Sequence, residues 1–490
     1  MTSRPHRIAS LLILALAAVA SPSPGAAAGP AAAPAGKDAL RGVIPGAQIA
    51  FLDSLERSAF RWFWELSDST TGLTPDRAPT PSFASVGAMG FALTACPIGA
   101  ERGWVTRAAA AERARRTLRF MARASQDSTD HAATGAQGFF YHFLDMKTGR
   151  RFEKIELSTI DTALMLAGAL FCQAYFDGSG VAEREVRAWT DTLMNRVDWR
   201  WAQPRPPAMV LGWSPEEGFL PYDWGGLNET IILHILALGS NTHRVAPGLW
   251  SAYTRHYRWG SFEGQQMLGF APLFGHQYSH VWIDFRGIRD DFMRAHDLDY
   301  FENSRRATLA QRAYAIANPS GLRGYGERLW GLTACDGPID TTFIVAGRQR
   351  EFFSYSARGA SFTRVHDDGT ICPAAAAGSM PFTPRESAEV LMAMRADYGT
   401  WAMNRYGFVD AFNPTLDFAA RVPYGRVVVG RGWFDVDQLG IDQGPILAMI
   451  ENARSGLIWR TMRRNPFIVR GLRRAGFQGG WLDAAPADWK

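Results

Sequence analysis

The sequence is poor in cysteine, and its cysteines lie far apart. Four are present among 490 residues, and no two are spaced as CxxC: Cys96, Cys172, Cys335 and Cys372. This pattern excludes a disulfide-rich scaffold and argues against a zinc site with thiolate ligands, although one disulfide is compatible with it. The HExxH motif of zinc peptidases is also absent.

The N-terminal apolar run, residues 8–20, is too short to cross a bilayer. Arg4 and Arg7 precede it, Ala18-Val19-Ala20 supplies a small-x-small cleavage site, and no cysteine follows to accept a lipid. We therefore expect residues 1–20 to be a cleaved signal peptide. The mature protein is expected in the periplasm or outside the cell, with no stable membrane insertion.

Low-complexity segments are few. Residues 21–45 are rich in Ala, Pro and Gly, which predicts a linker that buries nothing. No second tract of this kind divides the remaining chain, and no fixed-period repeat indicates a solenoid. We therefore expect one domain, residues 46–490, acting as a monomer.

The formal net charge is +5, and arginines gather between residues 454 and 474. These arginines alternate with apolar residues at helical spacing, which is typical of a solvated helix face. Together with the export signal, this argues against nucleic acid as a partner.

Helical periodicity dominates the sequence. Apolar residues recur at i, i+3, i+4 and i+7 in most of eight segments: 48–66, 105–124, 158–176, 181–197, 228–239, 303–319, 385–399 and 443–462. Parts of two segments, 160–174 and 230–238, are apolar on every face and must lie inside a large body. Strand signals are limited to a hairpin at 138–152 and a second candidate at 425–434. The pattern predicts an all-α fold in which helical hairpins close into a double-layered toroid.

The loops combine aromatic and acidic residues. "EEGFLPYDWGGLNE" (216–229) is one of five such loops, with 274–287, 324–337, 404–414 and 430–445. Rings exposed on loops can stack on the C–H face of a sugar, while carboxylates and amides bind its hydroxyls. Paired carboxyl groups in the same cleft suit hydrolysis of a glycosidic bond. The loops therefore favour a carbohydrate-active enzyme with a polysaccharide or oligosaccharide substrate.

Longer stretches carry a family resemblance. "GWSPEEGFLPYDWGGLNE", "LFGHQYSHVWIDFRG", "YFENSRRATLAQRAYAIANP", "GYGERLWGLTACDGP" and "GWFDVDQLGIDQGP" resemble the bacterial glycoamylase-like domain family. Within it the chain is most similar to glycoside hydrolase family 144, the endo-β-1,2-glucanases and related sophorose-releasing enzymes. The similarity runs from about residue 51 to residue 481. It implies an (α/α)6 toroid, an inverting mechanism without cofactor or metal, and β-1,2-linked glucose polymers as substrate; starch hydrolysis does not follow from the family name.

Four carboxylates are candidates for catalysis. Glu229 is either a first-turn acid that complements a helix dipole or, as the resemblance favours, the general acid. Asp161 closes a capping box in "STID", or it contacts substrate or water. Glu327, beside Trp330 in "GYGE", is the preferred second carboxylate, and Asp442 competes with it.

The remaining candidates would bind sugar. In the acidic loop these are Asp223, Glu217 and Trp224, which flank the Gly225-Gly226 turn. His276, His280, Asp284 and Arg286 are interpreted as hydrogen-bonding residues rather than metal ligands. Trp282, Tyr325, Trp330 and Trp433 are candidate aromatic contacts, although each could instead belong to the core.

Three other functions remain open at this point. A glycan lyase would need an acidic sugar and basic groups to neutralise it, whereas these loops are acid-rich. A retaining transglycosylase would use the same acids at a closer spacing, which sequence does not reveal. A periplasmic glycan-binding protein would keep the rings without needing the acids. Endo or exo action is likewise not readable from the sequence.

Overall fold

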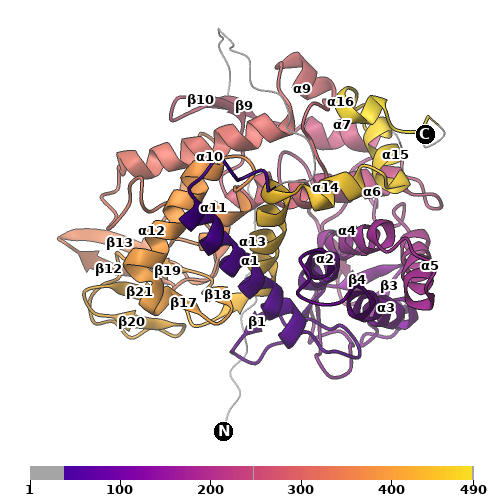
Figure 1. Ribbon diagram of the computed structural model, residues 1–490, viewed down its shortest axis with the longest axis horizontal. Helices are drawn as coiled ribbons and strands as arrows, with labels where there is room; N and C mark the ends of the chain where they lie inside the picture. Colours follow the sequence, from indigo (N-terminus) through magenta and orange to yellow (C-terminus); the bar gives the residue numbers. More distant parts are fainter. Residues whose placement is uncertain (1–37, 247, 488–490) are drawn as a thin grey trace.

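The computed structural model describes residues 38–246 and 248–487 (Figure 1). The predicted signal peptide lies outside the described residues, as does most of the predicted linker. The last part of that linker does pack: Leu40 and Ile44 are buried, because their side chains are apolar and reach the core. Among the described residues, no helix combines the length and the hydropathy that a membrane span requires.

The predicted helices are confirmed with one exception. Seven of the eight segments form a single helix each, with ends within about three residues of expectation: α1 (Gly46–Leu66), α3 (Arg107–Arg123), α4 (Thr159–Tyr175), α5 (Val181–Arg196), α6 (Ile231–Gly239), α10 (Tyr300–Ala317) and α12 (Pro384–Ala402). Segment 443–462 instead forms α13 (Gly440–Arg454) and α14 (Leu457–Met462). The break falls at Gly456, whose φ of +65° is left-handed and ends the helical path.

The arginine-rich stretch expected to form a helix face contains α15 (Pro466–Arg474). Several other helices were not predicted: α2 (Val86–Glu101), α7 (Gly248–Thr254), α8 (Tyr278–Trp282), α9 (Asp291–Ala295), α11 (Pro373–Gly378), α16 (Gly480–Asp483) and the 3-10 helix η1 (Leu273–His276). Most are too short for an amphipathic period to develop. α2 is long, but it is buried on every face and contains Pro97, so its sequence shows neither a polar stripe nor a continuous helical pattern.

Six of the helices within the described residues form an inner ring. α2 contacts α4, α4 contacts α6, and α6 contacts α8; on the other side of the ring, α11 contacts α13, and α13 contacts α2. α8 is joined to α11 by Gln277, whose side-chain amide donates to Ala375 O at 2.7 Å. The backbones of α2 and α4 lie so close together that a Cβ on Gly90 would be 2.3 Å from Leu164 O. Only glycine permits this approach.

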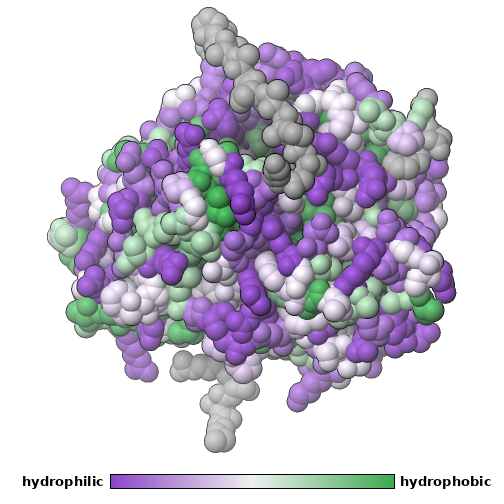
Figure 2. Space-filling model, in the orientation of Figure 1, coloured by the Kyte–Doolittle hydropathy of each residue, from purple (hydrophilic) through white to green (hydrophobic). Residues whose placement is uncertain are grey.

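A second layer of helices covers the ring. α3 and α5 lie against α2 and α4, α15 against α6, α10 against η1, α12 against α11, and α1 against α13 and α2. Figure 1 shows α1 and α13, from opposite ends of the chain, side by side. On the face drawn in Figure 2, hydrophilic residues dominate and hydrophobic patches are small and separated.

The all-α prediction is only partly right, because many short strands line the ends of the helices. Within the described residues the strands are β1 (Arg77–Ala78), β2 (Ala84–Ser85), β3 (Gly135–Ala136), β4 (Phe139–Tyr141), β5 (Phe143–Leu144), β6 (Leu157–Ser158), β7 (Gly212–Ser214), β8 (Gly218–Phe219), β9 (Trp259–Phe262), β10 (Gln265–Leu268), β11 (Ala334–Cys335), β12 (Thr341–Val345), β13 (Arg348–Phe352), β14 (Ser356–Ala357), β15 (Gly359–Ser361), β16 (Arg364–His366), β17 (Met403–Asn404), β18 (Gly407–Phe408), β19 (Phe412–Asn413), β20 (Arg426–Val428), β21 (Gly432–Phe434) and β22 (Gln438–Leu439). None is longer than five residues, which is too short for an alternating pattern to be read with certainty. The largest sheet has the antiparallel order β3-β4-β6-β7-β8.

The two predicted strand regions have different outcomes. The candidate at 425–434 is confirmed as the antiparallel pair β20–β21, with Val427 opposite Trp433. In the region 138–152 the predicted turn is present, with Leu144 bridged to Arg151. The flanking strands, however, pair elsewhere: β4 with β3 and β6, and β5 with β2.

Candidate active site

The first residues of the inner helices meet at one end of the ring. Ser279 Oγ in α8 donates to Glu229 O at 2.7 Å and accepts from Ile232 N at 3.0 Å, which joins α8 to the start of α6. The Tyr278 hydroxyl donates to Ile441 O at 3.3 Å, which joins α8 to α13. A Cβ on Gly87 in α2 would lie 2.5 Å from an oxygen of Asp161 in α4. Helix N-termini carry partial positive charge, so this end of the ring favours acidic groups.

Glu229 lies at this convergence, two residues before α6. Its Oε2 atom is buried and finds no hydrogen-bond partner among the described residues. Burial raises the pKa of Glu229 to about 7; its own backbone N–H opposes the shift, and the carboxylate of Asp161 adds to it. A carboxyl group that is protonated near neutral pH and has a free oxygen can serve as a proton donor.

Asp161 both caps its helix and contacts an imidazolium. Ser158 Oγ accepts from Asp161 N at 3.2 Å, which is the N-cap half of the predicted capping box, and donates to Asp161 Oδ2 at 2.6 Å, where a full box would have the Ser158 backbone N–H as donor. His142 places Nε2 3.4 Å from Asp161 Oδ2 and Nδ1 2.8 Å from Glu156 Oε1. Burial lowers the pKa of His142, but the carboxylates of Asp161 and Glu156 outweigh it and raise the pKa to about 9. His142 is therefore charged at neutral pH.

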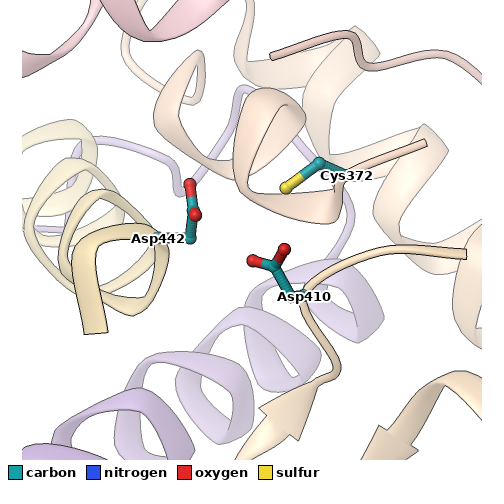
Figure 3. Close-up of side chains that lie close together, drawn as sticks. All are labelled: Cys372, Asp410 and Asp442. Carbon is teal, nitrogen blue, oxygen red and sulfur yellow. The ribbon is translucent and has the colours of Figure 1, made fainter. Parts of the chain in front are cut away.

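Asp442 lies in the first turn of α13 within a second acidic group. Figure 3 shows Asp442, Asp410 and Cys372 pointing toward one another, and their donor atoms lie within 4.8 Å. Asp336, Asp410 and Asp435 lie equally close together, so by distance either trio could hold a cation. Burial, followed by neighbouring acidic groups, raises the pKa of both Asp410 and Asp442 well above the ordinary value.

The two acidic groups both lie near Tyr278. Burial raises the pKa of Tyr278, and Asp442 and Glu229 both add to the shift, so both carboxylates are near its hydroxyl. The site is also open to solvent, since the side chains of His142 and Arg77 are 30% and 25% exposed. Arg77 donates to Asp336 at 2.5 Å and to Asp76 at 3.2 Å. The arrangement thus brings Glu229, a carboxyl group with a pKa of about 7, and a second carboxyl group, Asp442, near the same tyrosine.

Two predicted carboxylates lie outside this site. Glu327 is on a turn with its side chain 73% exposed, 3.5 Å from Arg312. The glycine-rich loop turns it outward, so it is not the second carboxylate that the sequence favoured. Glu217 is exposed at the β7–β8 turn, where its backbone N–H is capped by Ser214 Oγ.

The rest of the acidic loop, residues 216–229, lies partly at the site. Trp224 is half-buried, and its Nε1 donates to Thr159 Oγ1 at 2.9 Å, which fixes the ring beside the start of α4. Its contact with sugar stays a prediction. Asp223 instead accepts two bonds from Arg205, at 2.6 and 2.9 Å, so its carboxylate already has a charged partner.

The predicted aromatic platforms are largely core residues. Trp282, Trp330 and Trp433 are each 0% exposed, so none can stack on a substrate in this structure. Trp282 Nε1 donates to Thr94 Oγ1, and Trp433 Nε1 to Tyr424 O. Their large apolar rings fill the space between helices and strands. This burial decides where they lie, although the sequence around them was interpreted as loop. Tyr325 is half-buried, and its hydroxyl donates to Asp367 at 2.7 Å.

The four residues predicted to hydrogen-bond to sugar, His276, His280, Asp284 and Arg286, make contacts within the protein. Burial lowers the pKa of His276 to about 4 and that of His280 to about 3, so both are neutral. His280 packs among phenylalanine rings and hydrogen-bonds to Ser304 Oγ. Asp284 accepts from Arg286 at 2.7 Å and also pairs with Arg463, below the surface. These residues hold α8 and α14 in place rather than contact sugar.

Sequence reasoning missed several acidic residues of the site. Asp336, Asp410 and Asp435 lie in loops that the composition had marked, but nothing local distinguishes them from neighbours such as Asp417. In the structure each follows a short strand: Asp336 and Asp435 come directly after β11 and β21, and Asp410 comes two residues after β18. His142 lies between β4 and β5 in a stretch that was interpreted only as a hairpin. The described cysteines, all four, are free and buried.

Comparison with known proteins finds similar sequences and similar folds. The putative glucoamylase (Glycoamylase) family model matches residues 221–466. The exo β-1,2-glucooligosaccharide sophorohydrolase of Parabacteroides distasonis is 26% identical over 457 residues, which cover 86% of this chain and 57% of that protein. The chain thus spans little more than half the length of that curated relative.

Two solved structures are similar over nearly their whole length. A putative glucoamylase from Bacteroides uniformis superposes with a TM-score of 0.74 and 30% identity, covering 89% of this chain and 99% of that one. An endo-β-1,2-glucanase from Chitinophaga pinensis, solved with sophorotriose and glucose, superposes with a TM-score of 0.75 and 26% identity, with the same coverage. The chain is a member of the glycoamylase family.

Proposed function

We propose that this protein is an exported glycoside hydrolase that cleaves β-1,2-glucan to short oligosaccharides, including sophorose. The observation that carries the proposal is Glu229: a carboxyl group with a pKa of about 7 and a buried, unbonded oxygen, with a second carboxyl group, Asp442, near the same tyrosine, Tyr278. The substrate class is supported by the relatives, which are described as a β-1,2-glucanase and a sophorohydrolase. Export is supported by the basic and apolar pattern of residues 1–20.

In the proposed mechanism the two carboxyl groups have different roles. Glu229 gives its proton to the leaving glycosidic oxygen, and Asp442 takes a proton from the water that attacks the anomeric carbon from the opposite face. The configuration at that carbon is inverted, as in hydrolases whose carboxyl groups leave room for a water. Asp161 raises the pKa of Glu229 and is itself held by His142, while Trp224 offers a ring for the sugar.

We further propose that the inner and outer helices form an (α/α)6 double barrel. The closed contact order of α2, α4, α6, α8, α11 and α13 supports this, as does the second layer around it. In such a barrel the N-termini of all inner helices open onto one face. That face is where the carboxylates lie, which is why Asp161 and Asp442, 281 positions apart, contribute to one site.

The proposal is tested with purified protein and linear β-1,2-glucan in the presence of EDTA. We expect a time course of sophorose and other short gluco-oligosaccharides, and the order in which they appear separates endo from exo cleavage. Glu229→Gln should lose most of the activity. Glu327→Gln makes the same chemical change at an exposed site and should retain it. Hydrolysis of starch with no action on β-1,2-glucan would overturn the proposal.

A further inference from the structure

Asp410 contributes to the site although it is not one of the two proposed reacting groups. It lies in the loop between β18 and β19 and is 3% exposed, as is Asp442. Asp410 Oδ2 accepts from Asp336 N at 2.8 Å. Its Oδ1 is buried and has no donor within the part of the chain that the structure describes. Figure 3 shows this carboxyl aimed at the space between Asp442 and Cys372.

Two buried carboxyl groups this close cannot both be ionised at moderate cost. Like charges raise the free energy of the doubly ionised pair, and one retained proton relieves it. The other groups around the pair are mostly acids, thiols and phenols: Asp76, Asp336, Asp435, Cys335, Cys372, Tyr278 and Tyr355. Two described cations lie near the group, and each already has a carboxylate partner: Arg77 is bonded to Asp336 and Asp76, and Arg358 to Asp368. A shared proton therefore accounts for the pair.

The two carboxyl groups are not equivalent. Burial raises the pKa of both carboxyl groups well above the ordinary value. Asp410 lies in a loop rather than at a helix N-terminus, and its Oδ1 has no donor among the described residues, so of the two groups it is the one on which a retained proton costs least. Its backbone N–H donates to Asp437 O at 2.8 Å. Asp442, at the N-terminus of α13, has the helix dipole to favour its ionised form.

We propose that Asp410 is a positioning residue: it holds one proton and donates it in a hydrogen bond to Asp442, which keeps Asp442 ionised and oriented as the base. This inference rests on the proposed hydrolysis. During turnover Asp442 takes a proton from the attacking water, the pair becomes neutral, and that proton is then released to solvent. Asp410 keeps its own proton throughout and touches neither sugar nor water.

Two substitutions at Asp410 separate this role from a structural one. Asp410→Asn keeps a donor to Asp442 and an acceptor for Asp336 N, so kcat should stay within about tenfold and the acid limb of the pH–rate profile should not move. Asp410→Ala removes the donor; we expect kcat to fall about 100-fold with KM little changed. Its acid limb should rise by about one to two pH units, because a hydrogen bond to the charged form is lost. Circular dichroism and melting temperature confirm that each variant folds.

The proton itself is tested without substrate. In protein labelled with 13C at the aspartate carboxyl carbon, we expect one buried carboxyl to remain protonated at pH 7 and its signal to vanish in Asp410→Asn. Absence of that signal would overturn the proposal, as would an Asp410→Asn protein as inactive as Asp442→Asn. An acid limb that moves on adding Ca²⁺ or EDTA would show a cation in place of the proton. If the signal is present but β-1,2-glucan is not cleaved, the proposed function fails and the shared proton stands.

Discussion

Glu229→Gln should remove activity and, above neutral pH, stabilise the protein. The pKa of Glu229 is raised from 4.5 to about 7 in the folded state. The folded state therefore binds its proton more tightly than the unfolded state, and the stabilisation from that proton is present below pH 4.5 and lost as pH rises to 7. At about 1.4 kcal/mol per pKa unit, the wild-type protein loses about 3 kcal/mol across this window. Glutamine does not titrate, so the variant escapes the loss.

The most informative quantity is the difference in the free energy of unfolding between Glu229→Gln and wild type, measured as a function of pH. The amide that replaces Oε2 also lacks a partner there, and an unpaired buried amide costs about 1–3 kcal/mol at every pH. The variant should therefore be less stable than wild type at pH 4.5 and equal or more stable at pH 8, with a swing of about 3 kcal/mol between them. Urea unfolding at several pH values measures it. Turnover should fall by about 10² to 10⁴-fold at all pH values.

Two results would refute this reasoning. A stability difference that is independent of pH would show that Glu229 is not held neutral by burial. Turnover within about threefold of wild type would leave Glu229 as a helix-capping acid, whose loss costs only about 0.3–1 kcal/mol. Glu327→Gln is the matched control, since its exposed side chain should give neither a swing in stability nor a loss of rate.

Three further predictions concern other parts of the molecule. Proton NMR in the first minutes of hydrolysis should show the α-anomer at the new reducing end; an initial β-anomer would indicate a retaining transglycosylase. The pKa of His142 is raised from 6.5 to about 9, so its stabilisation is present below pH 6.5 and lost as pH rises through 9. His142→Gln should therefore cost about 1–2 kcal/mol at pH 6, after allowance for its partial exposure, and little at pH 10; equal losses at both would contradict the assignment. Trp282→Ala should reduce the free energy of unfolding by about 3–5 kcal/mol because the ring is fully buried, with KM little changed. A large rise in KM with unchanged stability would restore Trp282 as a sugar platform.

The helical skeleton could be predicted because amphipathic periods are local. α1, α3 and α5 each bury one face, and that face is readable within a few turns. α2 could not be predicted, because every face is buried and the pattern disappears. The short strands depend on partners far along the chain, such as Ala78 opposite Gln438, and two residues carry no period.

The site was predictable only where a residue's role depends on its immediate neighbours. The Ser158–Asp161 capping box and the turn from acidic loop to helix at Glu229 are local, and both are where the sequence placed them. Glu327 and Trp433 show the limit: their loops have the same composition as the active ones, but one turns to solvent and the other inward. Composition identifies loops that approach a site, whereas the direction of each side chain depends on long-range packing.

Helix N-termini account for only part of how the site buries so many acidic groups. A helix terminus stabilises a nearby carboxylate by about 0.3–1 kcal/mol, which corresponds to less than one pKa unit. Asp161, in the first turn of α4, has this stabilisation, with His142 beside it. It does not suffice for Glu229, where burial raises the pKa to about 7. Desolvation therefore decides which carboxyl keeps its proton, and a proton donor arises at Glu229 because its oxygen is shielded from water and from hydrogen-bond donors.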